Sequence, residues 1–230
     1  MNAPREVVPY IMELVKPTSV LDVGCGTGTW LKAFEEAGVN DYLGIDGGYV
    51  NRETLKISQD RFRAFDLRHS WTLKRKFDLV ISLEVVEHLP ETSADLFVEA
   101  LISHGNVILF SAAIPGQDGQ NHLNEQWPEY WQEKFIKHGF YFHDVIRPLI
   151  WNNEKVDLWY KQNIFLVRKS SENLNDKPLS IVHPDLFKLT ISNHDEYIAS
   201  LVEGRQGVRL AVAIFFNSIK YKLKSLLGLV

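Results

Sequence analysis

The sequence predicts an α/β domain in which a mostly parallel sheet carries helices on both faces. Short apolar runs alternate with longer segments of helical spacing, an order typical of parallel strands joined by right-handed crossovers. The first apolar run, 19–23, leads directly into a glycine-rich turn and then a helix. Acidic residues follow later runs where each strand is expected to end, and open sheets of this kind bind ligands at that edge.

The glycine-rich turn lies in the stretch 19–30, S-V-L-D-V-G-C-G-T-G-T-W. Gly24, Gly26 and Gly28 remove every second side chain, so the backbone can adopt positive φ and a ligand can approach it closely. Asp22 precedes the first glycine by two residues, which does not suit a phosphate-binding loop, and the dinucleotide pattern G-x-G-x-x-G is absent. An ordinary tight turn is the alternative interpretation.

The other elements follow in order along the chain. Helices are expected over 4–15, 30–36 and 92–103, and in a segment that ends near 138. Strands are expected over 42–45, 62–65, 77–83, 106–110, 140–146 and 163–167, with a long connection between the last two. In the helix over 92–103, the side chains of Leu96, Phe97, Ala100 and Leu101 are expected to face the core. The polar segment 117–131 is expected to fold over the open edge of the sheet as a lid.

The composition is that of an ordinary soluble globular protein. The 230-residue chain is 45% hydrophobic and 23% charged, which allows one sizeable core and an appendage. Its net charge of −4 argues against nucleic acid as a partner. A single cysteine, Cys25, cannot form an internal disulfide, and neither a secretory signal nor a run of ~20 apolar residues is found. We therefore expect a cytoplasmic location.

The letters D-V-G-C-G-T-G at 22–28 resemble the first motif of the class I S-adenosylmethionine-dependent methyltransferases. The resemblance covers residues 1–169 and implies a Rossmann-like sheet of seven strands, the last two forming an antiparallel pair. It also implies that Asp22 faces the amino acid end of the cofactor and that Asp66 accepts the adenine amino group. The predicted residues for S-adenosylmethionine, and for its product S-adenosylhomocysteine, are Asp22, Gly24, Cys25, Gly26, Gly28, Asp46, Gly47, Asp66, Leu67, Leu83 and Glu84.

Asp46 ends the second predicted strand about twenty residues after the glycine turn, where an acid binds the ribose diol of a nucleoside. A loop aspartate that caps the next helix is the alternative for this residue.

Methyl transfer to a hydroxyl requires alignment of two reactants and removal of the hydroxyl proton. Glu84, Glu87 and His88 follow the fourth strand at offsets of three and four, so one helical turn would place them on one face. His122 can approach from the predicted lid. We predict His122, Glu87 and His88 as catalytic residues, with His122 acting as a general base in the absence of metal. A solvated loop histidine is the alternative for His122.

The same four side chains, Glu84, Glu87, His88 and His122, offer oxygen and nitrogen ligands for Mn²⁺ or Mg²⁺. The pattern E-x-x-E-H with a distant histidine resembles the metal site of methyltransferases that act on the terminal 2′-hydroxyl of small RNA. It is also frequent in methyltransferases without metal. If no metal is bound, Glu84 lines the cofactor pocket, Glu87 caps a helix or forms an ion pair, and His88 packs near the substrate.

The end of the chain follows a separate pattern. Residues 170–178 are predicted to be a linker, and 179–230 a C-terminal extension with a basic amphipathic helix. Residues 204–230 contain five Lys or Arg and no acid. Such a helix suits peripheral contact with an anionic membrane, which would be the inner face, while packing against the core or in a homodimer is the equal alternative. The apolar positions with helical spacing are Val208, Val212, Phe215, Ile219, Leu223 and Leu226.

These observations predict an S-adenosylmethionine-dependent methyltransferase that acts on a hydroxyl of a sugar or glycan intermediate. Polar residues beside aromatic ones in the lid suit a sugar: Asn124, Glu125, Gln126, Trp127, Tyr130 and Trp131. The aromatic residues would equally suit the inner face of a helix. The lid and the tail resemble methyltransferases of bacterial polysaccharide biosynthesis. The alternatives are O-methylation of a quinone precursor or other small aromatic, RNA ribose methylation, which the acidic body disfavours, and a non-catalytic cofactor-binding subunit.

Overall fold

The computed structural model describes residues 2–170 and 180–227, and the chain divides into the compact units Met1–His183 and Pro184–Val230. Apart from Ser170, the linker predicted at 170–178 lies outside the described residues. Residues 180–183 belong to the first unit, where the backbone amide of His183 donates to Gln162 Oε1 at 2.6 Å.

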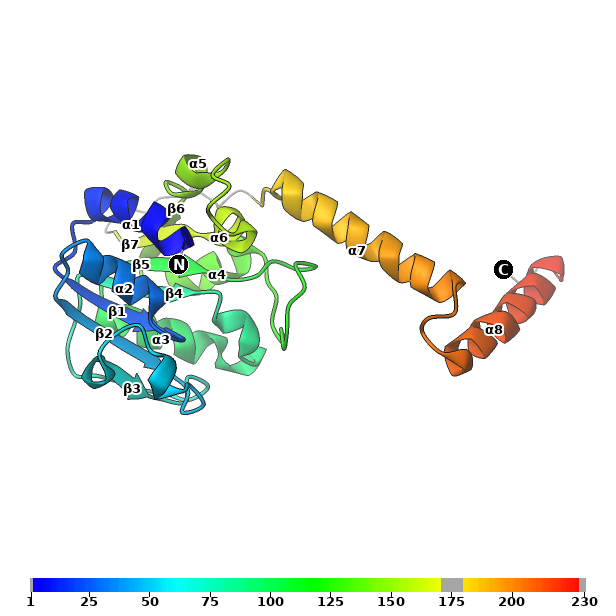
Figure 1. The fold of residues 1–230 in the computed structure, drawn as a ribbon, viewed down its shortest axis with the longest axis horizontal. Helices are drawn as coiled ribbons and strands as arrows, with labels where there is room; N and C mark the ends of the chain where they lie inside the picture. The colour runs from blue at the N-terminus through cyan, green and yellow to red at the C-terminus, as the bar shows by residue number, and fades with distance from the viewer. Residues whose placement is uncertain (1, 171–179, 228–230) are drawn as a thin grey trace. The chain divides into compact units, whose positions relative to one another are not determined.

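A seven-stranded sheet forms the middle layer of the first unit, in the order β3-β2-β1-β4-β5-β7-β6 (Figure 1). Strands β1 to β5 pair in parallel, whereas β7 runs antiparallel to both of its neighbours, β5 and β6. The predicted Rossmann-like sheet is therefore confirmed. The strands are β1 (Ser19–Val23), β2 (Asp41–Asp46), β3 (Phe62–Ala64), β4 (Leu79–Leu83), β5 (Val107–Ser111), β6 (Phe140–His143) and β7 (Phe165–Lys169).

Helices cover both faces of this sheet, as predicted. Side chains of α1, α2 and α5 pack on one face, and those of α3 and α4 pack on the other. The long connection expected between β6 and β7 contains two short helices, α5 and α6. The helices of the first unit are α1 (Asn2–Leu14), α2 (Thr29–Glu36), α3 (Ala94–His104), α4 (Pro128–Ile136), α5 (Arg147–Ile150) and α6 (Leu158–Asn163).

Helix α3 buries a slightly different face from the one predicted. Phe97, Ala100 and Leu101 are buried as expected, but Leu96 is 46% exposed, so its inward placement was wrong. The helix begins at Ala94, and Val98 takes the inner position beside Phe97. Because successive residues lie 100° apart around a helix, Leu96 falls outside the buried face that Ala94, Phe97, Val98 and Leu101 share.

Gly28 keeps helix α2 close to the loop that follows β2. It has φ 79° at the N-cap of α2, and a Cβ atom there would lie 2.8 Å from Ile57 Cγ1.

We expect Gly28→Ala to lower the free energy of unfolding by about 1–3 kcal/mol, measured by urea denaturation. The positive φ is unfavourable for alanine, and its methyl group would collide with Ile57. Gly38→Ala is the matched control, since Gly38 has φ +98° and no neighbour within 4 Å. Equal losses in the two variants would show that Ile57 exerts no steric effect.

The second unit consists of helices α7 (Pro184–Val202) and α8 (Val208–Leu226). The turn between them contains Gly204 and Gly207, both with positive φ. Within the described part of the chain, none of the helices combines the length and the apolar character that crossing a bilayer requires.

Candidate active site

A cavity of about 900 Å³ opens at the carboxyl edge of the sheet, where the strand order reverses between β1 and β4. Residues that follow four neighbouring strands, and two residues between β5 and α4, form its wall. They are Gly24, Gly26, Asp46, Gly47, Gly48, Tyr49, Phe65, Asp66, Leu67, Arg68, Glu84, Val85, His88, Leu89, Gln120 and Asn121. Seven of the eleven predicted cofactor residues are in this set. The prediction succeeds for them because residues just after the end of an apolar strand lie at this edge of the sheet.

The glycine turn approaches the chain leaving β4 very closely. Gly24 has φ +82°, and a Cβ atom there would lie 2.3 Å from Val85 Cγ2. Gly26 has φ +50° with nothing within 4 Å of its missing side chain, and it faces the cavity. The turn is held by β2, since the amide of Gly24 donates to Ile45 O at 2.8 Å and that of Gly26 to Asp46 Oδ2 at 2.7 Å. The arrangement leaves backbone exposed to a ligand.

Asp46 is buried at the end of β2 and lines the cavity. Its Oδ1 accepts hydrogen bonds from the amide of Gly47 and from the hydroxyl of Tyr49, both at 2.6 Å. The following 3₁₀ turn is capped by Asn51, not by Asp46. Partial desolvation of the hydroxyl, followed by its bond to Asp46, raises the pKa of Tyr49 to about 12, although the side chain as a whole is 85% exposed. The Tyr49 hydroxyl thus makes the kind of hydrogen bond to Asp46 that a ribose hydroxyl would make. The sequence analysis did not predict this contact.

Asp66 and Leu67 line the cavity beyond β3. Arg68 donates from Nε and Nη2 to the two carboxyl oxygens of Asp66 at 2.9 and 2.7 Å, which lowers the pKa of Asp66. The other four predicted cofactor residues, Asp22, Cys25, Gly28 and Leu83, do not line the cavity. Cys25 and Leu83 are buried in the apolar core, and Gly28 serves the packing of Ile57.

Asp22 is a buried acid in the middle of the sheet. Its Oδ2 has no hydrogen-bond partner within residues 2–170 and 180–227, and burial, followed by the charge of Asp46, raises its pKa well above the ordinary value. The folded chain therefore holds a proton that the unfolded chain releases near pH 4. The stability that this proton gives is complete below about pH 4 and is lost as the pH rises through the folded pKa.

We expect Asp22→Asn to remove this loss of stability at high pH. Without ligand, the variant should be more stable than the wild type by about 1–3 kcal/mol near pH 8 and equally stable near pH 4, measured by urea denaturation at both pH values. A difference in stability between variant and wild type that is the same at both pH values would show that ionisation of Asp22 is not its cause.

Glu84 leaves β4 with a left-handed backbone, φ 54°. Asn163 Nδ2 and Gln117 Nε2 donate to its two carboxyl oxygens at 3.1 and 3.0 Å, and Asn163 Nδ2 also lies 2.8 Å from Gln117 Oε1. Burial raises the pKa of Glu84, against these hydrogen bonds. Because its carboxylate points to this amide pair, Glu84 does not share a face with Glu87 and His88. The predicted helical turn is a 3₁₀ turn over Val86–His88 that begins after Glu84.

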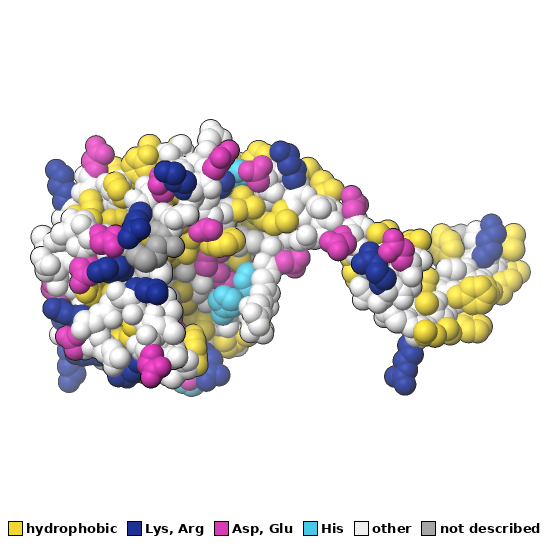
Figure 2. Space-filling model, in the orientation of Figure 1, with side chains coloured by type: hydrophobic (Ala, Val, Ile, Leu, Met, Phe, Trp, Pro, Cys, Tyr) yellow, Lys and Arg dark blue, Asp and Glu magenta, His cyan; other side chains and the backbone are white. Residues whose placement is uncertain are grey.

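The structure does bring Glu87, His88 and His122 together. Each offers one ligand atom, and these atoms lie within 4.8 Å of one another, the only such group of three or more among the residues that the structure describes. The rings of His88 and His122 meet edge to face, with centroids 4.9 Å apart. Figure 2 shows histidine side chains in cyan beside acidic ones in magenta on one face of the first unit. Glu84, the fourth predicted ligand, is not part of the group.

Glu87 is fully buried, yet no donor in the described structure makes a hydrogen bond to either of its carboxyl oxygens. Burial, and then the charge of Glu84, raise its pKa to about 9, although the amides of Glu87 and Ala113 favour the carboxylate to a smaller extent. Its backbone carbonyl accepts the amides of Leu123 and Asn124 at 2.7 and 3.0 Å, which ties the β5–α4 segment to β4. A buried acid without a donor suits a site that takes up a proton or a cation.

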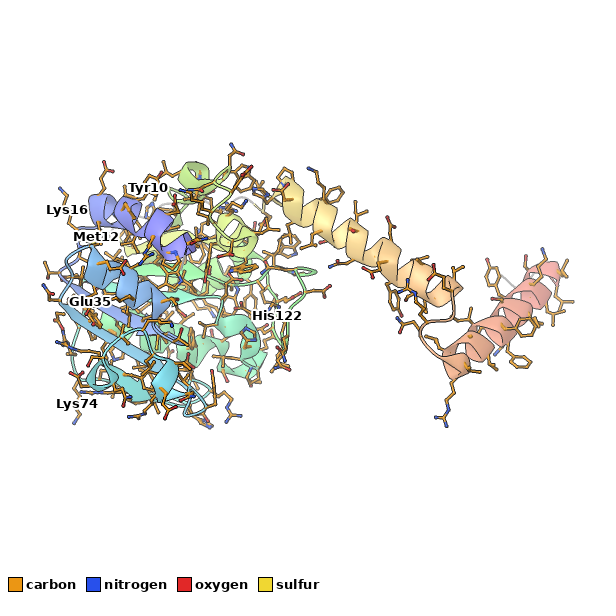
Figure 3. All side chains as sticks on the ribbon, in the orientation of Figure 1. Tyr10, Met12, Lys16, Glu35, Lys74 and His122 are labelled. Atoms are coloured by element: carbon orange, nitrogen blue, oxygen red, sulfur yellow. The ribbon has the colours of Figure 1, made fainter. Side chains whose placement is uncertain are left out.

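His122 lies on the segment between β5 and α4 (Figure 3). Its Nδ1 is 2.7 Å from Glu125 Oε1, and Glu125 Oε2 accepts the amide of Gly116 at 2.8 Å. A carboxylate at Nδ1 favours the proton on that nitrogen and leaves Nε2 as an acceptor or ligand. A Cβ atom on Gly119 would lie 2.2 Å from His122 Nε2, so glycine makes room for the ring. Sequence analysis missed both Glu125, as an orienting group, and Gly119.

The polar and aromatic rim predicted from the lid does not face the cavity. Asn124 is buried, Gln126 donates to it at 3.0 Å, and Glu125 is engaged by His122. Trp131 lies in the core against Phe110, with ring centroids 5.7 Å apart. The lid residues at the cavity are instead Gln120 and Asn121, earlier in the same segment.

Comparison with known proteins identifies the family of this chain. A family model described as a methyltransferase domain matches residues 2–152. A ubiquinone biosynthesis O-methyltransferase of Rhodopseudomonas palustris (strain TIE-1) is 32% identical over 82 residues, which cover 34% of this chain and 32% of the relative. The protein of the same name from strain HaA2 is 28% identical over 116 residues, 48% of this chain and 42% of the relative. This chain thus aligns with less than half the length of these relatives.

Solved structures show the same fold at low sequence identity. The methyltransferase domain of bacterial CtHen1-C has a TM-score of 0.54 at 16% identity and covers 74% of this chain and 98% of that domain. CalS10, an amino pentose methyltransferase from Micromonospora echinaspora solved with S-adenosylmethionine bound, has a TM-score of 0.54 at 17% identity over 73% of this chain and 90% of CalS10.

Proposed function

Since this chain belongs to the class I S-adenosylmethionine-dependent methyltransferases, we propose that it transfers the methyl group of its cofactor to a hydroxyl oxygen, most favourably one on a sugar or glycan. The observation that carries the proposal is the cluster of Glu87, His88 and His122, whose ligand atoms lie within 4.8 Å of one another beside the cavity. An alcohol is a poor nucleophile until it loses its proton, so a hydroxyl acceptor needs such groups near the methyl.

The protein's part in the reaction is alignment and proton removal. The cavity edge at β1 and β2 would hold the nucleoside through Asp46, and the acceptor would enter from the side of His88 and His122. The hydroxyl oxygen must lie in line with the sulfur–methyl bond, so that the new oxygen–methyl bond forms as the sulfur departs. Without a bound cation, His122 Nε2 would accept the hydroxyl proton, because Glu125 holds the ring by Nδ1 at 2.7 Å.

The cluster also has the composition of a divalent cation site. Glu87 offers a buried carboxylate without a hydrogen-bond donor in the described structure, and His88 and His122 offer imidazole nitrogens. We propose that these three residues hold Mn²⁺ or Mg²⁺ in the active enzyme. A bound cation would lower the pKa of the acceptor hydroxyl and orient it.

Polar residues among those that line the cavity support a sugar as the acceptor. They include Gln120 and Asn121 and the ion pair of Asp66 and Arg68. Amides pair well with sugar hydroxyls because they both donate and accept. A quinone precursor is the second candidate, since the curated relatives that match are ubiquinone biosynthesis O-methyltransferases, and Phe65, Val85 and Leu89 line the same wall.

A transfer assay with methyl-labelled S-adenosylmethionine tests the acceptor. Nucleotide sugars, lipid-linked sugars, catechol-type quinone precursors and RNA should be offered in parallel, and label should enter a sugar as an ether. Label in the aromatic acceptor alone would select the second candidate. Label in none of them, with normal cofactor binding, would favour a non-catalytic cofactor-binding subunit.

Chelation tests the cation. We expect dialysis against a chelator to reduce turnover by about 100-fold and added Mn²⁺ to restore it, because the hydroxyl then loses its activating cation. Calorimetry should also detect Mn²⁺ binding to the wild type but not to Glu87→Gln. Full turnover after chelation, with no Mn²⁺ binding, would leave His122 as a base that works without metal.

A further inference from the structure

Helix α8 carries a continuous apolar face that nothing in its unit covers. The helix spans 19 residues, about 28 Å at 1.5 Å per residue, and none of them is buried. The face repeats at intervals of three and four residues, which places its members on one side of the helix. Its exposed members are Val208, Val212, Phe215, Phe216, Ile219, Leu223 and Leu226. Figure 2 shows hydrophobic side chains along α8 with Lys and Arg beside them.

The charges of α8 are all of one sign. At 100° per residue, Arg209 and Lys220 border the apolar face on one side and Lys222 borders it on the other, while Lys224 lies farther round the helix. Residues 204–230 contain no acid. Across the described parts of both units, no salt bridge reaches any of these four cations, although α7 carries acids such as Asp195 and Glu196. The helix therefore combines exposed apolar surface with uncompensated positive charge.

We propose that α8 binds the surface of an anionic lipid bilayer, lying in the interface with its apolar face toward the acyl chains. Cations on both borders of an apolar face can extend to anionic headgroups while their aliphatic stems stay with the lipid. Two aromatic residues, Phe215 and Phe216, add large apolar area. The helix cannot span the bilayer, because it is neither apolar enough nor free of charge.

Charge complementarity selects the bilayer over a second copy of the helix. Two copies of α8 packed by the same face would bring their bordering cations together, and residues 204–230 supply no acid to neutralise them. An anionic membrane supplies the missing negative charge along the whole length of the helix. The inference goes beyond methyl transfer, since it would hold for any acceptor.

The test uses the full chain and two matched variants. Ile219 lies at the centre of the apolar face and is 43% exposed, whereas Ile214 lies on the opposite side and is 40% exposed. Ile219→Asp and Ile214→Asp therefore make the same chemical change, in the same helix, at nearly equal exposure. Each is measured by flotation with vesicles of phosphatidylglycerol and phosphatidylcholine, and with phosphatidylcholine alone.

We expect the wild type to partition about tenfold more strongly into the anionic vesicles, with the difference shrinking at high salt. Ile219→Asp should abolish binding, and Ile214→Asp should leave most of it. Replacing Lys220 and Lys224 by Gln should weaken binding to anionic vesicles only. Equal loss in both isoleucine variants, or no binding by the wild type, would overturn the proposal. A dimer that Ile219→Asp dissociates, with no vesicle binding, would assign the face to a second copy instead.

Discussion

Asp46→Ala is expected to weaken the binding of S-adenosylmethionine by about 100-fold, measured by isothermal calorimetry. The buried carboxylate would accept hydrogen bonds from the ribose hydroxyls, and bonds to a charged group contribute about 1.5–3 kcal/mol each. The same carboxylate accepts the amides of Gly26 and Gly47 at 2.7 and 2.6 Å, so its loss also loosens the glycine turn. Both effects act on the cofactor before any chemistry occurs.

Tyr49→Phe separates these effects. It removes only the hydroxyl that now donates to Asp46 Oδ1 at 2.6 Å and leaves the carboxylate and both amides in place. We expect cofactor affinity to be unchanged or to rise by about two- to tenfold, because the Tyr49 hydroxyl competes for the oxygen that the ribose needs. Normal binding by a folded Asp46→Ala would remove the ribose assignment. A large loss in Tyr49→Phe would show that the tyrosine holds the cofactor directly.

The strands were predictable because their environment is simple. A parallel strand covered on both faces is a nearly continuous apolar run, and β4, L-V-I-S-L, is buried at every position. Glycine at every second position after β1 then marks the turn. Helix faces are harder to predict, since an apolar residue such as Leu96 can lie at the edge of the buried face and remain exposed.

The site was predictable only where distance along the chain translates into distance in space. Asp46, Asp66 and His88 reach the cavity because each follows the end of a strand. Asn163 reaches Glu84 from 79 residues away through the packing of α6 on the sheet, and no spacing in the sequence encodes that contact. The left-handed backbone of Glu84 was equally invisible, because non-glycine residues rarely adopt it, and it decides where the carboxylate points.

The largest effect is expected at His122. His122→Ala should lower kcat by about 100- to 10,000-fold, because the acceptor hydroxyl loses both the base and one of the groups that hold it. The affinity for S-adenosylmethionine should stay within about twofold of the wild type, since His122 is not among the residues that line the cofactor cavity. Single-turnover transfer of a labelled methyl group, with calorimetry on the same samples, measures both quantities.

Two further variants distinguish a chemical role from a structural one. His138→Ala removes an exposed histidine at the end of α4 and should leave kcat unchanged. Glu125→Gln keeps the size of the group at 2.7 Å from His122 Nδ1 but not its charge, so the ring is held less firmly. We expect an intermediate loss of kcat, about tenfold. A Glu125→Gln enzyme as slow as His122→Ala would mean that the main role of the pair is to hold the β5–α4 segment in place.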